Sequence, residues 1–224
     1  MIHTNSDIEK SVLELARTEI EIYLRHGICP LIENYFGSED DCEEVLDWIH
    51  AVHRDAIYGV NILGDFPYAF DLAKKYGAKF IQIDSVSGHN NPKDDALFAR
   101  CLDSYRSQSD SVILGGVRFK YQPVNSGRSL KEDLLIGMDR CDAIVCTGSG
   151  TGKSTPMEKV NEFKEHLGNF PVIVGAGVTQ ESAKCTFNVA DGAIVGSWFK
   201  CLHKDYNMVN EKYVQDFVKE VRNQ

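Results

Sequence analysis

The sequence predicts an α/β fold, a single (β/α)8 TIM barrel over residues 1–224 with a clipped first strand. Three observations predict it. Short β-type runs alternate with helical patterns, successive runs are spaced by about one βα unit, and no linker or low-complexity stretch divides the chain. The clear runs are residues 30–33, 56–61, 79–84, 111–114, 142–146, 171–174 and 192–195.

The first strand of this barrel is its shortest predicted element. Residues 1–3, Met-Ile-His, bring the strand count from seven to eight if they form a short strand. The alternative fold is an open doubly wound sheet, which needs a switch point in the strand order and usually has about five or six strands. The count and the even spacing favour the barrel.

Capping patterns mark the starts of the intervening helices. Ser6 with Glu9, and Ser129 with Glu132, have the spacing of a capping box. Thr155 stands before a proline and an acidic residue, which is typical of a helix N-cap. These patterns predict helices before the runs at 30–33, 142–146 and 171–174.

Composition and charge exclude several classes of protein. Hydrophobic residues make up 43% and charged residues 25% of the chain, as in ordinary globular domains. Acidic residues outnumber basic ones, 33 to 24, and the net charge of −9 argues against a nucleic-acid-binding protein. No apolar run approaches the ~18 residues of a membrane span, and residues 1–7 lack the features of a signal peptide.

The cysteine pattern indicates a reducing, cytoplasmic location. The seven cysteines are odd in number, scattered and without a C-x-x-C pair, so they form neither a disulfide framework nor a zinc signature. Cys146, at the end of one run, is interpreted as a buried apolar thiol and not as a nucleophile. The sequence predicts no cofactor.

Polar residues at the carboxyl ends of the first four strands form the candidate catalytic group. In a barrel, chemistry is carried out at this end of the strands. Period-2 alternation places Asn61 and Asp84 toward the barrel mouth, and Glu33 ends the neighbouring run. We predict Glu33, Asn61 and Asp84 as catalytic, with the carboxylates as general acid or base. Hydrogen bonding that only shapes the mouth is the alternative, and His3 with Glu33 and Asp84 is a weaker candidate set of metal ligands.

Glycines after the last two strands predict a phosphate site. Gly175 and Gly177 follow the seventh run, and Gly196 and Ser197 follow the eighth. Glycine lets backbone N–H groups approach an anion closely, and a helix starting at Ser197 adds a favourable dipole. Lys200 is expected to add a charge there or to cover apolar surface. Plain turn glycines are the alternative.

The loop after the sixth strand resembles a P-loop but is one residue too short. Three residues separate Gly148 from Gly152, where the P-loop pattern has four, and Thr147 stands where its first glycine belongs. This argues against a nucleoside triphosphatase. We predict a ligand loop of Thr147, Gly148, Gly150, Gly152 and Lys153, with Lys153 as a point charge. A merely flexible loop is the alternative.

Four segments, taken in order, resemble the BtpA/SgcQ family. They are PLIENYFG at 30–37, GVNIL at 59–63, DAIVCTGSGTG at 142–152 and DGAIVGS at 191–197. The resemblance implies a phosphate-binding barrel related in architecture to phosphoribosylanthranilate isomerase and ribulose-phosphate-binding barrels. Members are named for photosystem I biogenesis, lie with carbohydrate-uptake genes or are labelled nucleoside triphosphatases. This chain departs from the family in its clipped first strand and the short loop that follows.

Two classes of function stay open. One is an enzyme that acts on a small phosphorylated, sugar-like or nucleoside-like ligand by proton transfer or by C–O or C–N bond chemistry. The other is a non-catalytic assembly or regulatory factor that keeps the barrel as a scaffold. The polar mouth residues favour the enzyme. The expected partner is the small phosphorylated ligand, with no nucleic acid and no membrane span, and homo-oligomerisation is left open.

Overall fold

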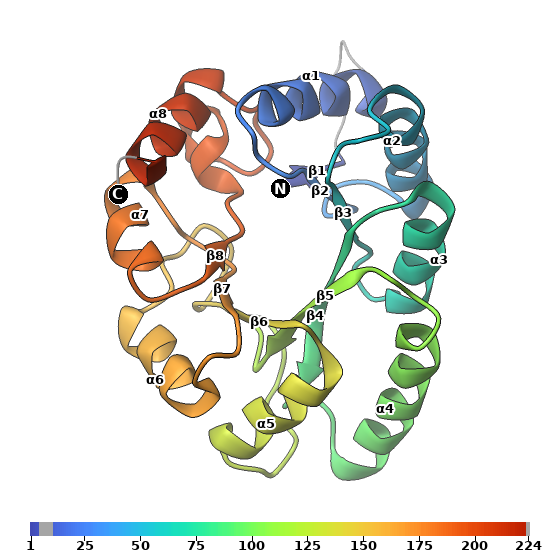
Figure 1. Ribbon diagram of the computed structural model, residues 1–224, viewed down its shortest axis with the longest axis vertical. Coiled ribbons are helices and arrows are strands. Elements are labelled where there is room, and N and C mark those ends of the chain that lie inside the picture. The colour runs from blue at the N-terminus through green and yellow to red at the C-terminus, as the bar shows by residue number, and fades with distance from the viewer. Residues whose placement is uncertain (5–10, 223–224) are drawn as a thin grey trace.

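The computed structural model describes residues 1–4 and 11–222 and forms the predicted (β/α)8 TIM barrel (Figure 1). Eight parallel strands follow one another in the order β1 to β8. This order never reverses, so the sheet has no switch point and the open doubly wound alternative is wrong. The strands are Ile2–His3, Leu31–Glu33, Gly59–Asn61, Phe80–Ser87, Val112–Val117, Ala143–Cys146, Val172–Val174 and Gly192–Ala193.

The helices form an outer ring around the strands, as Figure 1 shows. Two short 3₁₀ turns, η1 and η2, interrupt the last connection before α8. No helix of the described residues is both long and apolar enough to cross a membrane. The helices α1 to α8 are Val12–Arg25, Glu39–Val52, Phe66–Tyr76, Pro92–Arg106, Leu130–Arg140, Met157–Leu167, Gln180–Phe187 and Glu211–Arg222, and η1 and η2 are Ser197–Phe199 and Cys201–His203.

The first and last strands are the shortest, with two residues each. The predicted clipped first strand is therefore present. β1 pairs with β2 through Ile2 and His3. On the other side, the nitrogen of Met1 donates to the carbonyl of Val195 at 2.8 Å, just beyond β8. This hydrogen bond brings the two ends of the curled sheet together.

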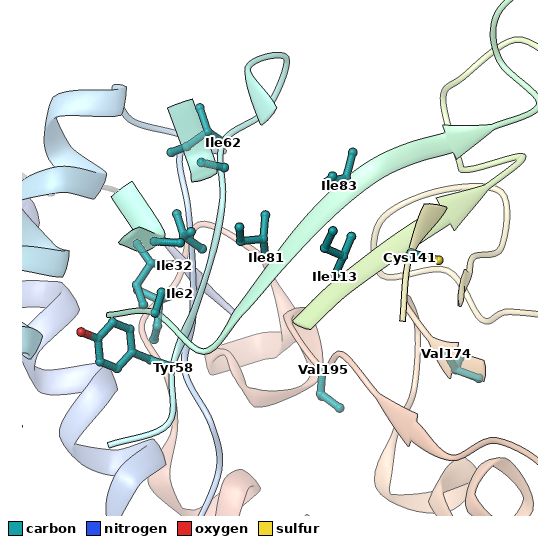
Figure 2. Close-up of a cluster of buried hydrophobic side chains, with 14 of the residues drawn as sticks. Ile2, Ile32, Tyr58, Ile62, Ile81, Ile83, Ile113, Cys141, Val174 and Val195 are labelled. Carbon is teal, nitrogen blue, oxygen red and sulfur yellow. The ribbon is translucent and has the colours of Figure 1, made fainter. Parts of the chain in front are cut away.

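The outward-facing strand residues form one buried apolar cluster with the helices. Figure 2 shows Ile32, Ile81 and Ile113, which project from β2, β4 and β5, and all three are almost fully buried. Because side chains alternate along a strand, Gln82 and Asp84 occupy the opposite face of β4. The core thus fixes which polar groups reach the barrel interior.

Two predicted helix starts can be compared with the structure. Ser129 and Glu132 form the predicted capping box at α5. At α6 the N-cap is Pro156 and not Thr155, because the Thr155 hydroxyl donates to the carbonyl of Ala176 at 3.0 Å. Thr155 therefore ties two loops together instead of capping the helix.

The predicted capping box of Ser6 and Glu9 lies outside the described residues. The helix that the structure describes there, α1, has Ser11 as its N-cap. Ser11 and Glu14 make both hydrogen bonds of a capping box. A capping box is therefore present at this helix, but it is formed by a different pair of residues.

A buried ion pair joins α1 to the segment after β8. The Lys200 ammonium donates to both carboxylate oxygens of Glu19 at 2.7 Å, and the backbone N–H of Val209 adds a third bond at 2.9 Å. Lys200 and Glu19 are both nearly inaccessible to solvent. Lys200 therefore serves this ion pair, and the expectation that it adds charge at the glycine corner is wrong.

We expect Lys200→Met to destabilise the fold by about 3–5 kcal/mol, because it leaves the Glu19 carboxylate buried without its counter-ion. The double variant Glu19→Gln/Lys200→Met should regain most of this loss, since glutamine still accepts from Val209. Urea denaturation measures both values. Lys212→Met is the matched control, because it breaks an exposed pair with Asp216 whose contribution is about 0.3–0.5 kcal/mol. Equal losses for Lys200→Met and Lys212→Met would contradict the prediction.

Candidate functional site

A cavity of about 320 Å³ opens at the carboxyl ends of the strands. Its walls come from loops that follow strands all around the barrel, so residues far apart in the sequence meet there. This is the end of the barrel where the sequence predicts chemistry. The lining residues that matter below are His3, Glu33, Gln82, Asp84, Lys120, Tyr121, Thr151, Gly152, Gly175, Gly177, Gly196, Ser197, Trp198, His203 and Asp205.

Four adjacent strands supply a continuous chain of hydrogen-bonded side chains at this face. His3 Nε2 lies 3.2 Å from a carboxylate oxygen of Glu33. The Asn61 amide donates to the other Glu33 oxygen at 2.7 Å and to Asp84 Oδ1 at 3.1 Å. The Gln82 amide donates to the same Asp84 oxygen at 2.9 Å. The structure therefore brings the three predicted catalytic residues into one network.

Strand register explains why these side chains meet. His3 pairs with Glu33 across β1 and β2, and Glu33 pairs with Asn61 across β2 and β3. Paired residues in neighbouring parallel strands lie at the same height and on the same face. The three side chains therefore line up without any help from loop conformation.

Asp84 has a perturbed acidity with an identifiable origin. Burial raises the pKa of the Asp84 carboxyl, and the negative charge of Glu33 raises it further. Hydrogen bonds from Gln82 and Asn61 and the charge of Lys120 lower this pKa, but burial outweighs them. A carboxyl group that holds its proton more readily is suited to general acid or base chemistry.

Three side chains that line the cavity have buried polar atoms without a partner. Among the described residues, His3 Nδ1, Gln82 Oε1 and Trp198 Nε1 make no hydrogen bond to protein. Buried polar groups are normally satisfied, because an unpaired one costs about 1–3 kcal/mol. Three residues of the cavity lining therefore carry buried polar atoms that the protein itself leaves without a partner.

A metal site at His3, Glu33 and Asp84 has little support. Within residues 1–4 and 11–222 no group of three or more His, Cys, Asp or Glu side chains has a metal-binding arrangement. The amide N–H₂ of Asn61 stands between the two carboxylates and donates to each of them. A hydrogen-bond donor in that position takes the lone pairs that a cation would need.

The predicted phosphate residues all line the cavity. Gly175, Gly177, Gly196 and Ser197 lie together on its wall. The Ser197 hydroxyl, however, donates to Asp205 Oδ1 at 2.5 Å. The predicted helix start at Ser197 is also only a three-residue 3₁₀ turn, so its dipole is small. The corner depends on backbone N–H groups and not on a helix end.

Gly177 has a packing role in addition to its place on the wall. Its φ is +68°, and a Cβ atom there would lie 2.2 Å from the carbonyl oxygen of Lys153. No other residue type fits this close approach. Gly177 thus holds the loop after β6 against the loop after β7.

Only one of the five predicted residues of the ligand loop lines the cavity. Gly152 does so, whereas Lys153 is exposed and is not part of the wall. Gly148 lies so close to the Ser154 carbonyl that a Cβ would be 2.6 Å from it. The helix after this loop starts at Met157, well past the lysine, which argues further against a P-loop.

The remaining residues of this loop hold the neighbouring loop in place. Thr147 is buried, and its hydroxyl accepts from the backbone N–H of Lys120 at 2.8 Å. Gly150 packs against the hydroxyl of Tyr121, which also accepts from the N–H of Thr151 at 2.8 Å. The loop after β6 is therefore ordered by the loop after β5, and the flexible-loop alternative is less well supported.

The sequence prediction missed the cation and the aromatic side chains of the cavity. Lys120 Nζ lies 3.1 Å from the Thr151 hydroxyl, inside the cavity wall. Tyr121 lies beside it, and a hydrogen bond from Thr151 lowers the pKa of the Tyr121 hydroxyl. Across the cavity Trp198 stacks on His203, with ring centroids 4.1 Å apart. Tyr121 and His203 have positive φ, a conformation that these residue types do not signal in sequence.

Cys146 is an inert thiol, as the sequence indicates. It is fully buried, and burial raises its pKa to about 12. Cys42 and Cys141 have the same environment, with pKa values also raised to about 12 by burial. Such thiols do not ionise near neutral pH and carry no nucleophilic chemistry.

A sequence model described as the BtpA family matches residues 10–223, which is almost the whole chain. The protein belongs to the BtpA family. This confirms the resemblance seen in the sequence and agrees with the barrel just described.

Relatives of this BtpA-family protein come from archaea and bacteria. An uncharacterized protein of Methanocaldococcus jannaschii is 29% identical over 160 residues, which cover 68% of this chain and 59% of the relative. The sgc region protein SgcQ of Escherichia coli is 23% identical over 173 residues, covering 73% and 63%. The aligned part thus spans about three fifths of the length of these relatives.

Solved structures share the fold at low sequence identity. The 3-hexulose-6-phosphate synthase of Salmonella typhimurium has a TM-score of 0.66 at 13% identity and covers 94% of both chains. The N-(5'-phosphoribosyl)anthranilate isomerase of Pyrococcus furiosus has a TM-score of 0.59 at 18% identity, with 92% of this chain and 94% of that one covered. Identities this low show the fold alone.

We expect Asp84→Asn to stabilise the BtpA-family protein at pH 7 by an amount on the order of 1 kcal/mol. The folded state favours the protonated form of Asp84, so ionisation costs stability as the pH rises through the unfolded value of about 3.9 and then the higher folded pKa. The gain should therefore grow between about pH 4 and pH 7 in denaturation curves of variant and wild type.

The exposed Asp110→Asn is the control for this measurement, and we expect it to leave stability unchanged at every pH. A gain from Asp84→Asn that does not vary with pH would show that Asp84 has an ordinary acidity.

Proposed function

We propose that this BtpA-family protein is an enzyme that acts on a small phosphorylated, sugar-like or nucleoside-like compound by acid/base chemistry. One observation carries the proposal: Asp84, with its raised pKa, lies in a cavity beside a second carboxylate, Glu33, and three unpaired polar atoms. Titratable groups whose pKa is shifted by burial and by a neighbouring like charge are found most often at functional sites.

The network assigns a role to each predicted catalytic residue. Asp84 gives or takes the proton of the substrate, because its carboxyl lines the cavity and is poised by burial. Asn61 is a positioning residue, since it donates to Asp84 and to Glu33 at once. Glu33 supplies the negative charge that keeps the Asp84 pKa high. Proton transfer and C–O or C–N bond chemistry both fit this arrangement.

The glycine corner and Lys120 are the proposed phosphate site. In the described residues, the backbone N–H groups of Gly177, Gly196 and Ser197 make no hydrogen bond to protein. Such N–H groups form an anion-binding concavity when they converge. Lys120 lies on the same cavity and provides a formal positive charge. The names of the two solved structures above refer to phosphorylated sugars, which agrees with this proposal.

Several finer predictions stay predictions. They are the cytoplasmic location, the absence of nucleic-acid binding and of a cofactor, and homo-oligomerisation. The seven cysteines are all free thiols in the structure, which is consistent with the reducing location but does not test it.

We expect Lys120→Gln to weaken binding of phosphorylated sugars and nucleotides by about tenfold, as removal of one charge-assisted contact does. The measurement is isothermal titration with a panel of phosphorylated compounds, after a thermal-shift screen. Binding of unphosphorylated analogues should not change.

Lys153→Gln is the matched control, because Lys153 is an exposed lysine of the facing loop that is not on the cavity wall. It should bind like the wild type. A loss with Lys153→Gln and none with Lys120→Gln would restore the sequence-based assignment, and no binding of any phosphorylated compound would overturn the proposed function.

A further inference from the structure

A second cavity opens beside the first, between the loops that follow β3 and β4. Its volume is about 300 Å³, and it shares Leu63, Gly64, Asp84 and Gln122 with the first cavity. Volumes of about 300–1,000 Å³ are usual for small-molecule sites. Since Asp84 lies on both cavities, a ligand held at Asp84 can occupy the two together.

Apolar side chains belong to the lining of the second cavity. Phe66 of α3 and Phe98 of α4 meet edge to face, with ring centroids 5.2 Å apart. Ile62 and Ile83 complete the apolar surface. Hydroxyl groups placed against these side chains would lose their hydrogen bonds to water without replacement, which disfavours a sugar ring there.

Apart from Asp84, the polar groups of the cavity are uncharged donors and acceptors. His89 Nδ1 lies 2.8 Å from the Ser85 hydroxyl, while its Nε2 makes no hydrogen bond within the described residues. The side-chain amides of Asn90 and Gln122 also line the cavity and form no hydrogen bond within the same residues. Burial lowers the pKa of His89, so its ring is neutral at pH 7 and offers one donor or one acceptor at Nε2.

No cation lines this cavity in the part of the chain that the structure describes. The nearby guanidinium of Arg140 is bound to both oxygens of Asp95, and that of Arg128 bridges Asp95 and Asp133. A ring that carries a carboxylate would therefore find no counter-ion here, and it would meet Asp84. The walls select a planar ring that is uncharged.

We propose that this second cavity binds an uncharged nitrogen heterocycle of the nucleobase type, so that the substrate is a nucleoside 5'-phosphate or a close analogue. The inference rests on the function proposed above and chooses between its sugar-like and nucleoside-like substrates. The heterocycle packs on Phe66 and Phe98, and its edge bonds His89 and Asn90. The pentose then lies at Asp84, and the phosphate lies in the first cavity.

The test compares five probes by isothermal titration: ribose 5-phosphate, adenosine, uridine and the 5'-monophosphates of the two nucleosides. We expect at least one monophosphate to bind about tenfold or more tightly than ribose 5-phosphate, since the base adds contacts. His89→Gln and Asn90→Ala should each remove most of this advantage and leave the binding of ribose 5-phosphate unchanged. His166→Gln, on α6 away from both cavities, is the matched control and should bind like the wild type.

The outcomes separate this inference from the proposed function. Equal affinity for ribose 5-phosphate and both monophosphates, or equal losses for all of them in His89→Gln and Asn90→Ala, overturns the heterocycle site and keeps the phosphate site. Binding of nucleosides without any gain from the phosphate keeps the heterocycle site and overturns the phosphate site. If no probe binds, both proposals are wrong.

Discussion

The parallel register of the first strands is the constraint on which the rest of the site depends. Register places His3, Glu33 and Asn61 at one height across β1, β2 and β3, and Asp84, two residues beyond that height on β4, joins them through the Asn61 amide. A slip of one residue in any of these strands would turn its polar side chain into the apolar layer under the helices. The same core that includes Ile32 and Ile81 therefore holds the chemistry in place.

The row stores an electrostatic cost that the fold has to offset. Two carboxyl groups share one amide donor in a partly desolvated place, and burial together with the charge of Glu33 opposes the ionisation of Asp84. Hydrogen bonds from Asn61 and Gln82 reduce this cost without removing it. Elsewhere the molecule uses buried charge differently: Glu19 and Lys200 neutralise each other at the seam between α1 and the end of the chain. The electrostatic cost is thus unrelieved at the proposed site, at the barrel mouth, and relieved by a counter-ion between α1 and the end of the chain.

This contrast also bears on the choice between an enzyme and a scaffold. A barrel kept only as a scaffold would gain stability if Gln82 and Trp198 found partners or were replaced by apolar residues. Instead both residues, with their unpaired buried atoms, belong to the lining of the cavity that holds Asp84. Unsatisfied polar groups around a carboxyl with a raised pKa favour the proposed ligand-binding site over a scaffold.

Whether the sequence could predict a site residue depends on the interactions that fix that residue in place. Strand periodicity and the order of the runs were enough for Glu33, Asn61 and Asp84, because backbone pairing sets their positions. Lys120 was missed because the loop after β5 turns at Arg118 and Tyr121, which both have positive φ. Arginine and tyrosine in a sequence do not indicate this backbone conformation. Lys153 was chosen for its likeness to a P-loop lysine, yet its loop packs backbone to backbone against Gly177, and it lies outside the wall.

The charges around the glycine corner decide what kind of contact can hold an anion there. Asp205 takes the Ser197 hydroxyl as a donor and brings a negative charge to the same wall. The hydroxyl is therefore not available to a phosphate while that bond lasts, and Lys200 is committed to Glu19. What remains are the backbone N–H groups of Gly177, Gly196 and Ser197 and the charge of Lys120. Contacts of this kind are short and directional, so they discriminate by the shape of the anion. At this proposed phosphate site the charge of Asp205 opposes part of the attraction that Lys120 and the N–H groups offer to an anion.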